Sequence, residues 1–403
     1  MREIPIVLIG HKDHGKSTLI GRLLLDTNSV KENRVKEIRE VDNTSGQKFE
    51  LAHLVDSFKE EREREMTMDT TQALLKGEKR FYQLIDVPGH QELISHMLTG
   101  ASKAEAAILL VSIEEGIKEQ TRQHLEVAKL LGIGQLAVAV NKIDKKGYRK
   151  EDFEEIVSKI KEILEEIGYS PENTKFFPIS AWGGDNVVRK SKKTPWYQGE
   201  SLMDFLENKI KEPRPLDSFP LTFLVQDKYI EKEEEILVGK IESGRLIKGR
   251  EILFLPERKK TKVREIKDSE GALEEAEAGR NVGITLFDNL GISRGAVGTV
   301  LDSSLQIDEV LAGEIFWIDK PSQRKLILEC GTAQVEGKLQ KPELINQGEK
   351  TLYQISLKKP IAFDSSGRTI LGKIVLKDEG KIIAVGNIKQ NNPIRYTNPM
   401  GLV

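Results

Sequence analysis

The segment IPIVLIGHKDHGKSTLIGRLLL, residues 4–25, narrows the possible folds of this chain more than any other feature. An apolar run typical of a strand leads into a glycine loop, and the loop opens a helical pattern. In the loop, Gly10 is followed after four residues by Gly15, Lys16 and Ser17, the spacing of a phosphate-binding loop. Glycines let backbone N–H groups close around phosphate oxygens, while the lysine reaches the terminal phosphates and the serine binds magnesium. The segment therefore predicts a strand, a phosphate-binding loop and a helix.

The pattern of elements predicts three domains. Up to residue 211, apolar runs such as AAILLVSI alternate with helical patterns such as EDFEEIVSKIKEILEEIG, which indicates a mostly parallel sheet with helices on both faces. Residues 212–220, EPRPLDSFP, contain three prolines and predict a linker. Short strand patterns with glycine turns follow, and they predict two small antiparallel β-barrels over residues 221–302 and 303–403.

Composition excludes several classes of protein. The chain has 62 basic and 64 acidic residues, so it is not built mainly to coat nucleic acid. Its single cysteine, Cys330, excludes an internal disulfide framework and a cysteine-built zinc site. The sequence contains neither an apolar stretch of about 18 residues nor a signal-peptide pattern, so we expect a cytoplasmic protein with no membrane segment.

Three further motifs predict which nucleotide is bound. In LIDVPGH, Asp86 ends a strand and is expected to bind magnesium, and Gly89 follows with a backbone N–H for the terminal phosphate. In AVNKID, the carboxylate of Asp144 can accept hydrogen bonds from both the ring N–H and the exocyclic amine of guanine, a pair of donors that adenine lacks. The segment PISAW adds a loop that can offer backbone N–H groups to the base carbonyl.

Together these motifs predict a domain that binds GTP and GDP with Mg²⁺. The expected nucleotide-binding residues are Asp13, His14, Gly15, Lys16, Ser17, Thr18, Gly89, Asn141, Lys142, Asp144, Ser180, Ala181 and Trp182.

With these four motifs in order, the chain resembles the translation-factor class of GTPases, which includes elongation factor Tu. The resemblance extends to EREREMTMDTT, which is similar to the first switch, and to DVPGHQELISHMLTGAS, which is similar to the second. It implies that Thr67 binds magnesium together with Ser17 and Asp86, and that His90 positions the attacking water. The catalytic residues implied are then Lys16, Thr67 and His90.

Within this class the chain resembles the large, GTP-hydrolysing subunit of bacterial sulfate adenylyltransferase, or ATP sulfurylase. The segments that carry this resemblance lie mostly outside the nucleotide motifs: GDNVV, TPWYQG, IESGRLIKGREILFLPERKKTKVREI and KKPIAFD. The resemblance implies that GTP hydrolysis is coupled to adenylyl transfer from ATP to sulfate. The transfer itself would belong to a small catalytic subunit, the expected partner in a heteromer.

Three residues depart from the pattern of the class. Lys12 stands where the phosphate-binding loop usually has an apolar residue, and Glu65 and Met66 replace the usual glycine and isoleucine before the switch threonine. The usual apolar residues are thought to form a gate beside the catalytic histidine. We therefore expect these changes to affect hydrolysis more than nucleotide binding.

Two alternatives share the predicted architecture. One is a factor that delivers aminoacyl-tRNA to the ribosome, although KYIEKEEEI and EGALEEAEAG are largely acidic, where a tRNA-facing surface should be basic. The other is a GTP-dependent scaffold whose gate is disabled. Measured turnover would separate the scaffold from both other hypotheses.

Overall fold

The computed structural model of the chain divides into two compact units, Met1–Pro213 and Arg214–Val403. The residues that it describes are 3–30, 33, 36, 51, 72–86, 104, 106–211, 216–231, 234–365 and 369–389. None of the helices within these residues is long and apolar enough to cross a membrane.

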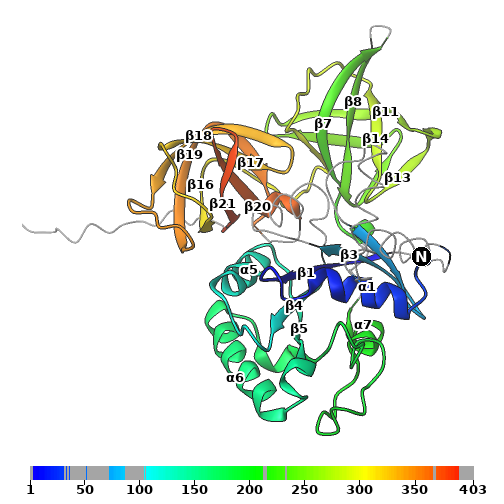
Figure 1. The fold of residues 1–403 in the computed structure, drawn as a ribbon. Helices are drawn as coiled ribbons and strands as arrows, with labels where there is room; N and C mark the ends of the chain where they lie inside the picture. The colour runs from blue at the N-terminus through cyan, green and yellow to red at the C-terminus, as the bar shows by residue number, and fades with distance from the viewer. Residues whose placement is uncertain are drawn as a thin grey trace, which may run out of the picture. The chain divides into compact units, whose positions relative to one another are not determined.

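The first unit is built on a sheet with the strand order β2-β3-β1-β4-β5-β6 (Figure 1). Neighbouring strands run parallel except for the edge pair β2 and β3, which is antiparallel. The strands are β1 (Glu3–Gly10), β2 (Gln72–Lys76), β3 (Phe81–Asp86), β4 (Ala106–Ser112), β5 (Gln135–Asn141) and β6 (Lys175–Pro178). The described α-helices are α1 (Lys16–Asp26), α5 (Glu119–Leu130), α6 (Lys150–Ile167) and α7 (Leu202–Lys209).

The helices cover both faces of this sheet, as its apolar strands require. Strand β4 is buried along its whole length, which is typical of a parallel strand packed on two sides. Helices α1 and α7 share one core with alternate residues of β1, β4 and β5, and Figure 1 shows α5 and α6 on the opposite side. Helix α6 turns one stripe inward, formed by Phe153, Ile156, Ile160 and Leu164, and it ends at Gly168 in the left-handed conformation.

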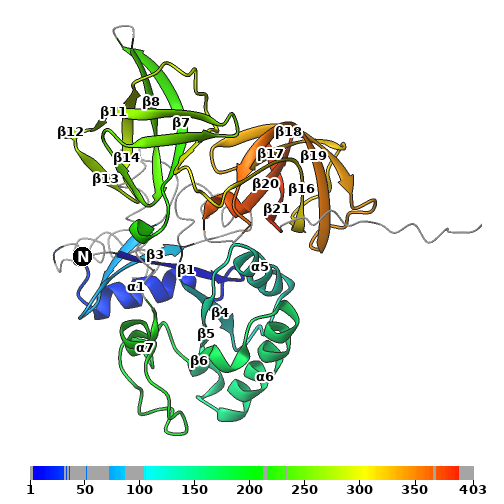
Figure 2. The same cartoon turned by 180° about the vertical axis from the view of Figure 1, so that it is seen from behind.

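The second unit consists of two barrels (Figure 2). The first closes in the order β10-β15-β7-β8-β14-β11, since β11 also pairs with β10, and β12 extends it beyond β11. Strands β9 and β13 form a separate pair. The strands are β7 (Thr222–Glu231), β8 (Glu234–Ser243), β9 (Arg245–Ile247), β10 (Glu251–Leu255), β11 (Lys259–Asp268), β12 (Gly271–Leu273), β13 (Glu275–Glu277), β14 (Asn281–Leu286) and β15 (Val297–Thr299).

The second barrel closes in the order β16-β19-β18-β17-β20-β21, and β21 returns to β16. Its strands are β16 (Gln306–Trp317), β17 (Lys325–Cys330), β18 (Ala333–Lys341), β19 (Lys350–Phe363), β20 (Lys373–Asp378) and β21 (Lys381–Ile388). Its core includes Trp317 and Ile355, both fully buried, and Leu224 of the first barrel belongs to the same apolar cluster. Burial of each such side chain contributes about 1.5–3 kcal/mol.

The predicted architecture is confirmed: an α/β domain with a mostly parallel sheet precedes two antiparallel barrels. The apolar runs identified in the sequence form β1, β3, β4, β5 and β6. Strand β2 lies outside that prediction. The domain boundaries at 211/212, 220/221 and 302/303 stay predictions.

Cys330 provides a chemical test of the second barrel. The side chain is only 2% exposed at the end of β17, and its thiol donates a hydrogen bond to the carbonyl of Leu371 (3.2 Å). Burial raises the pKa of the thiol to about 12. At slightly alkaline pH we therefore expect the native chain to resist a thiol-specific chromogenic reagent and the denatured chain to release one equivalent. Rapid reaction of the native chain would contradict this packing.

Candidate nucleotide-binding site

The predicted site residues collect along one edge of the sheet. Gly10, Asp86 and Asn141 are the last residues of β1, β3 and β5. Because these strands are parallel, their carboxyl ends meet at the same edge, where open α/β sheets bind ligands. The register agrees with this arrangement, since Leu8 lies opposite Asp86 and Ser112 lies opposite Asn141.

The phosphate-binding loop needs its two glycines for both space and conformation. Gly10 has a φ of 140° and Gly15 a φ of 93°, values that side chains rarely adopt. A Cβ atom at Gly10 would lie 2.4 Å from the carbonyl oxygen of Leu110, and one at Gly15 would lie 2.4 Å from Nδ2 of Asn141. Gly15 is also the N-cap of α1. The backbone can therefore bend tightly in front of a helix N-terminus, where unpaired N–H groups attract anions.

Lys16 is held inside this loop. Its side chain is 7% exposed, and its ammonium donates hydrogen bonds to the carbonyls of Gly10 (3.0 Å) and His11 (3.1 Å). Burial lowers the pKa of Lys16, and the carboxylates of Asp86 and Asp13 oppose that shift. The ammonium thus lies in the ring of the loop, where a phosphate would replace the carbonyls as its partner.

Ser17 and Asp86 form a pair that fits a magnesium ion. The hydroxyl of Ser17 donates a hydrogen bond to Oδ2 of Asp86 (2.8 Å). Asp86 is 5% exposed, and its Oδ1 atom is buried with no hydrogen-bond partner among the described residues. A buried carboxylate oxygen without a donor is costly unless a ligand completes it. Oxygen donors of this kind suit Mg²⁺, which keeps several of its waters.

His14 connects the phosphate-binding loop to strand β4. The side chain is fully buried and its Nδ1 atom lies 3.1 Å from the carbonyl oxygen of Leu110 in β4. Burial lowers the pKa of its imidazole, against the opposing effects of the Leu110 carbonyl and Glu115. Lys12 and Asp13, by contrast, are exposed, and Asp13 has a φ of 64°.

Asn141 ties three segments of the site together. Its Nδ2 atom donates to the carbonyl of His14 (2.9 Å), and its Oδ1 atom accepts the backbone N–H of Ala181 (2.9 Å). Asp144 follows in a short 3-10 helix, Ile143–Lys146, and its Oδ1 atom is buried without a hydrogen-bond partner among the described residues. That oxygen is an acceptor available to the two guanine donors. Lys142 adopts a φ of 63° and pairs with Glu115 (3.5 Å).

The loop 180–184 has one backbone N–H to offer. The N–H groups of Ser180, Ala181, Gly183 and Gly184 donate to Asp185 O, Asn141 Oδ1, Ser180 Oγ and Ser180 O, respectively. The N–H of Trp182 has no acceptor among the described residues, and this side chain is 60% exposed. The sequence predicted that Ser180 and Ala181 would offer their N–H groups to the base carbonyl. The hydrogen bonds favour Trp182 as that donor.

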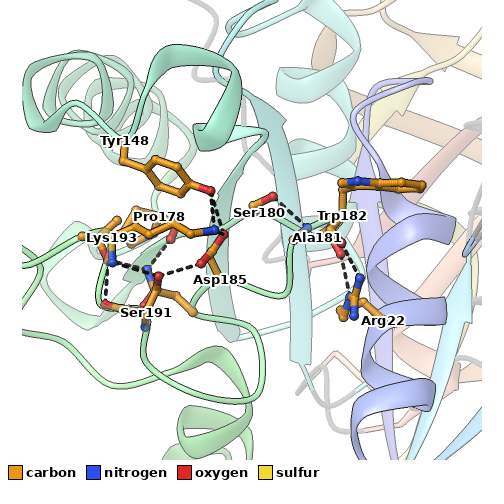
Figure 3. A network of polar contacts seen from close by, with 12 residues as sticks. Arg22, Tyr148, Pro178, Ser180, Ala181, Trp182, Asp185, Ser191 and Lys193 are labelled. Atoms are coloured by element: carbon orange, nitrogen blue, oxygen red, sulfur yellow. Dashed lines mark hydrogen bonds and ion pairs between the residues drawn. The ribbon is translucent and has the colours of Figure 1, made fainter.

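Two supporting contacts were not predicted from the sequence. The backbone N–H of Gly10 donates to Nδ1 of His124 in α5 (3.2 Å). From α1, the guanidinium of Arg22 donates to the carbonyls of Ala181 (3.1 Å) and Trp182 (Figure 3). Neither residue belongs to a motif, so only the folded chain brings them to the site.

Thr18 lies in the first turn of α1, as predicted. The predicted residues Thr67, Gly89 and His90, with Glu65 and Met66, lie outside the described residues.

Comparison with known proteins decides the family. Residues 1–212 match the family described as the elongation factor Tu GTP binding domain. The chain belongs to the elongation factor Tu family. It is a GTPase that binds GTP or GDP with Mg²⁺, in agreement with the donors and acceptors described above.

Relatives named "Elongation factor 1-alpha" resemble the chain over nearly its whole length. The protein from Pyrobaculum calidifontis is 35% identical, with 97% of this chain and 95% of the relative covered. Those from Hyperthermus butylicus and Methanoculleus marisnigri are 34% and 31% identical, with 97% and 94% of this chain and 97% and 95% of the relatives covered.

These relatives correct one expectation from the sequence. The chain was expected to be the GTPase subunit of sulfate adenylyltransferase with a small catalytic partner, and that expectation is wrong. The relatives match both barrels as well as the GTPase domain, and their name is that of a translation factor. The segments GDNVV and TPWYQG, on which the resemblance to the sulfurylase subunit rested, follow the 180–184 loop or overlap its end, inside the GTPase domain.

Replacement of Asp144 by Asn tests the assigned base contact. The amide would offer a donor where guanine also offers donors, so GDP should bind about ten- to a hundredfold more weakly. Xanthosine diphosphate, which has a carbonyl in place of the exocyclic amine, should bind better than it does to the wild type. Titration calorimetry with both nucleotides would measure the change. Equal affinity of the wild type for ATP and GTP would contradict the assignment.

Proposed function

We propose that the chain is a GTP-dependent carrier of aminoacyl-tRNA to the ribosome. The observation that carries the proposal is the extent of similarity to relatives named as elongation factors, which covers 97% of this chain and not only its GTPase domain. A GTPase that had kept only its switch would have no physical reason to retain both barrels in the same order. The proposed partners are aminoacyl-tRNA and the ribosome, and the proposed location is therefore the cytoplasm.

The residues of the nucleotide site would divide the work of hydrolysis. Lys16 and the N-terminus of α1 would hold the phosphates, while Ser17 and Asp86, with Thr67, would hold Mg²⁺. The metal ion supplies positive charge to the β- and γ-phosphate oxygens. His90 would position the attacking water, a role that rests on the family resemblance. Because Gly89 and His90 follow Asp86 after only Val87 and Pro88, loss of the terminal phosphate would first affect the segment that carries them.

In the folded barrel, basic side chains partly neutralise the acidic segments that argued against tRNA binding. Several of the described glutamates in KYIEKEEEI and EGALEEAEAG pair with basic residues of other strands or of the same hairpin. The pairs are Glu234 with Arg264 (2.6 Å), Glu235 with Lys228 (3.3 Å), Glu274 with Lys248 (2.6 Å) and Glu277 with Arg245 (3.0 Å). Cross-strand pairing compensates these charges locally, so a count of acidic residues along the sequence overstates the negative charge of the surface.

The carrier function predicts protection of the ester bond of aminoacyl-tRNA. With GTP bound, the chain should slow spontaneous deacylation of aminoacyl-tRNA, and with GDP it should protect far less. The rate of loss of a radiolabelled amino acid from tRNA measures this directly. The Asp144→Asn variant supplied with GTP is the matched control, since it should lose protection and regain it with xanthosine triphosphate. Absence of protection by the GTP-loaded wild type would overturn the proposal.

Lys12 is expected to make intrinsic hydrolysis slow. It is exposed and has no hydrogen bond or ion pair among the described residues, so its flexible, hydrated ammonium is poorly organised to stabilise a transition state and can crowd the attacking water. The variant Lys12→Val should hydrolyse GTP faster while its affinity for GDP changes little. Single-turnover phosphate release gives the rate, and Lys190→Val, at another exposed lysine, controls for the lost charge. Slower hydrolysis by Lys12→Val would instead make Lys12 a catalytic cation.

A further inference from the structure

Asp185 is a buried carboxylate that follows the 180–184 loop, and both of its oxygens accept hydrogen bonds. It is 8% exposed, and it accepts hydrogen bonds from the hydroxyls of Ser191 (2.6 Å) and Tyr148 (2.8 Å) and from the ammonium of Lys193 (3.1 Å). Figure 3 shows these three side chains converging on it from two separate segments of the chain. Burial alone would raise the pKa of Asp185, but the three hydrogen bonds and the charge of Lys193 lower it, so the group stays anionic.

The backbone of Asp185 shapes the loop that faces the base. Its carbonyl accepts the N–H of Ser180 (3.1 Å), and the turn between them is closed by the N–H of Gly184 bonding to the carbonyl of Ser180 (2.7 Å). The N–H of Gly183 bonds to the hydroxyl of Ser180 (3.0 Å). These bonds occupy every N–H of the turn except those of Ala181, which bonds to Asn141, and Trp182. The carbonyl of Asp185 is therefore one anchor of the turn that carries Trp182, together with Asn141 and Arg22.

Tyr148 connects the same carboxylate to the segment that carries Asp144. The N–H of Tyr148 donates to the carbonyl of Ile143 (3.0 Å), and the N–H of Gly147 donates to that of Asp144 (3.1 Å). The ring of Tyr148 thus extends from a tight turn whose conformation includes Asp144, and its hydroxyl ends on Asp185. One anionic residue, Asp185, therefore links the segment that carries Asp144 to the turn that carries Trp182.

We propose that Asp185 is a positioning residue for guanine selectivity, which sets the spacing between the carboxylate of Asp144 and the N–H of Trp182. Asp185 makes no contact with the base itself. It acts through Tyr148 on one side and through the 180–184 turn on the other, and it excludes the alternative spacings that a loosely held loop would sample. The inference depends on guanine binding at this site and is independent of tRNA delivery.

The test compares GDP with inosine diphosphate, which lacks the exocyclic amine that Asp144 would accept. The Asp185→Asn substitution replaces one acceptor oxygen by an NH2 donor and removes the negative charge. The side chain can then no longer accept all three hydrogen bonds from Tyr148, Ser191 and Lys193, and its ion pair with Lys193 is lost. We expect GDP affinity to fall about tenfold, in line with the loss of such a bond, and inosine diphosphate affinity to fall less. The ratio of the two affinities should therefore decrease. Asp152→Asn is the matched control, because Asp152 pairs with Arg149 (2.7 Å) and has no recorded bond to the 180–184 turn.

A role limited to the stability of the domain would give a different result. GDP and inosine diphosphate would then weaken by the same factor, which would overturn the proposal, as would an unchanged affinity for both. If Asp185→Asn fails to fold by circular dichroism, Tyr148→Phe decides, since it removes one hydrogen bond and keeps the ring. In that variant a smaller decrease of the ratio supports the proposal, and an unchanged ratio rejects it.

Discussion

The side-chain amide of Asn141 is the contact on which the nucleotide site depends. Its two hydrogen bonds, to the carbonyl of His14 and from the N–H of Ala181, connect the phosphate-binding loop, the base-recognition segment and the 180–184 loop. Asn141 is 2% exposed, so a substitution that removed either hydrogen bond would leave a buried carbonyl or N–H group unpaired. Asn141 can make both bonds because β5 ends at the same sheet edge as β1. The geometry of the site therefore depends on the parallel sheet.

Three carboxylates of this region, of which Asp86 and Asp185 are buried and Asp144 is half-buried, differ in how many hydrogen bonds they accept. Asp185 receives three hydrogen bonds, whereas Asp86 and Asp144 each keep one buried oxygen without a partner among the described residues. Unsatisfied buried acceptors destabilise a domain and persist where a ligand completes them. The contrast supports the proposals that Asp86 and Asp144 meet the metal ion and the base and that Asp185 shapes the surrounding chain.

The correction from a sulfurylase subunit to the elongation factor Tu family shows where local sequence reasoning fails. The segment GDNVV was used only as evidence of family resemblance, although Asp185 within it accepts hydrogen bonds from Tyr148, Ser191 and Lys193. The acidic runs were counted along the sequence, although Glu234 and Glu274 meet Arg264 and Lys248 across strands. In both cases the property depends on partners distant in the sequence, and these become neighbours only when the sheets form.

The sequence by itself determined the glycine loop between β1 and α1 and the order of an α/β domain and two barrels, and it predicted Asp144 as the carboxylate that recognises the base. These features depend on short-range patterns: glycines before a helix, apolar runs of strand length, and fixed spacings within a motif. Only the tertiary structure decided which N–H of the 180–184 loop stays available, which residue orients Tyr148, and how His124 and Arg22 support the loop. Those outcomes require a count of hydrogen-bond partners in three dimensions. The reason is that a buried donor or acceptor must be satisfied by whatever group the fold places within about 3 Å of it.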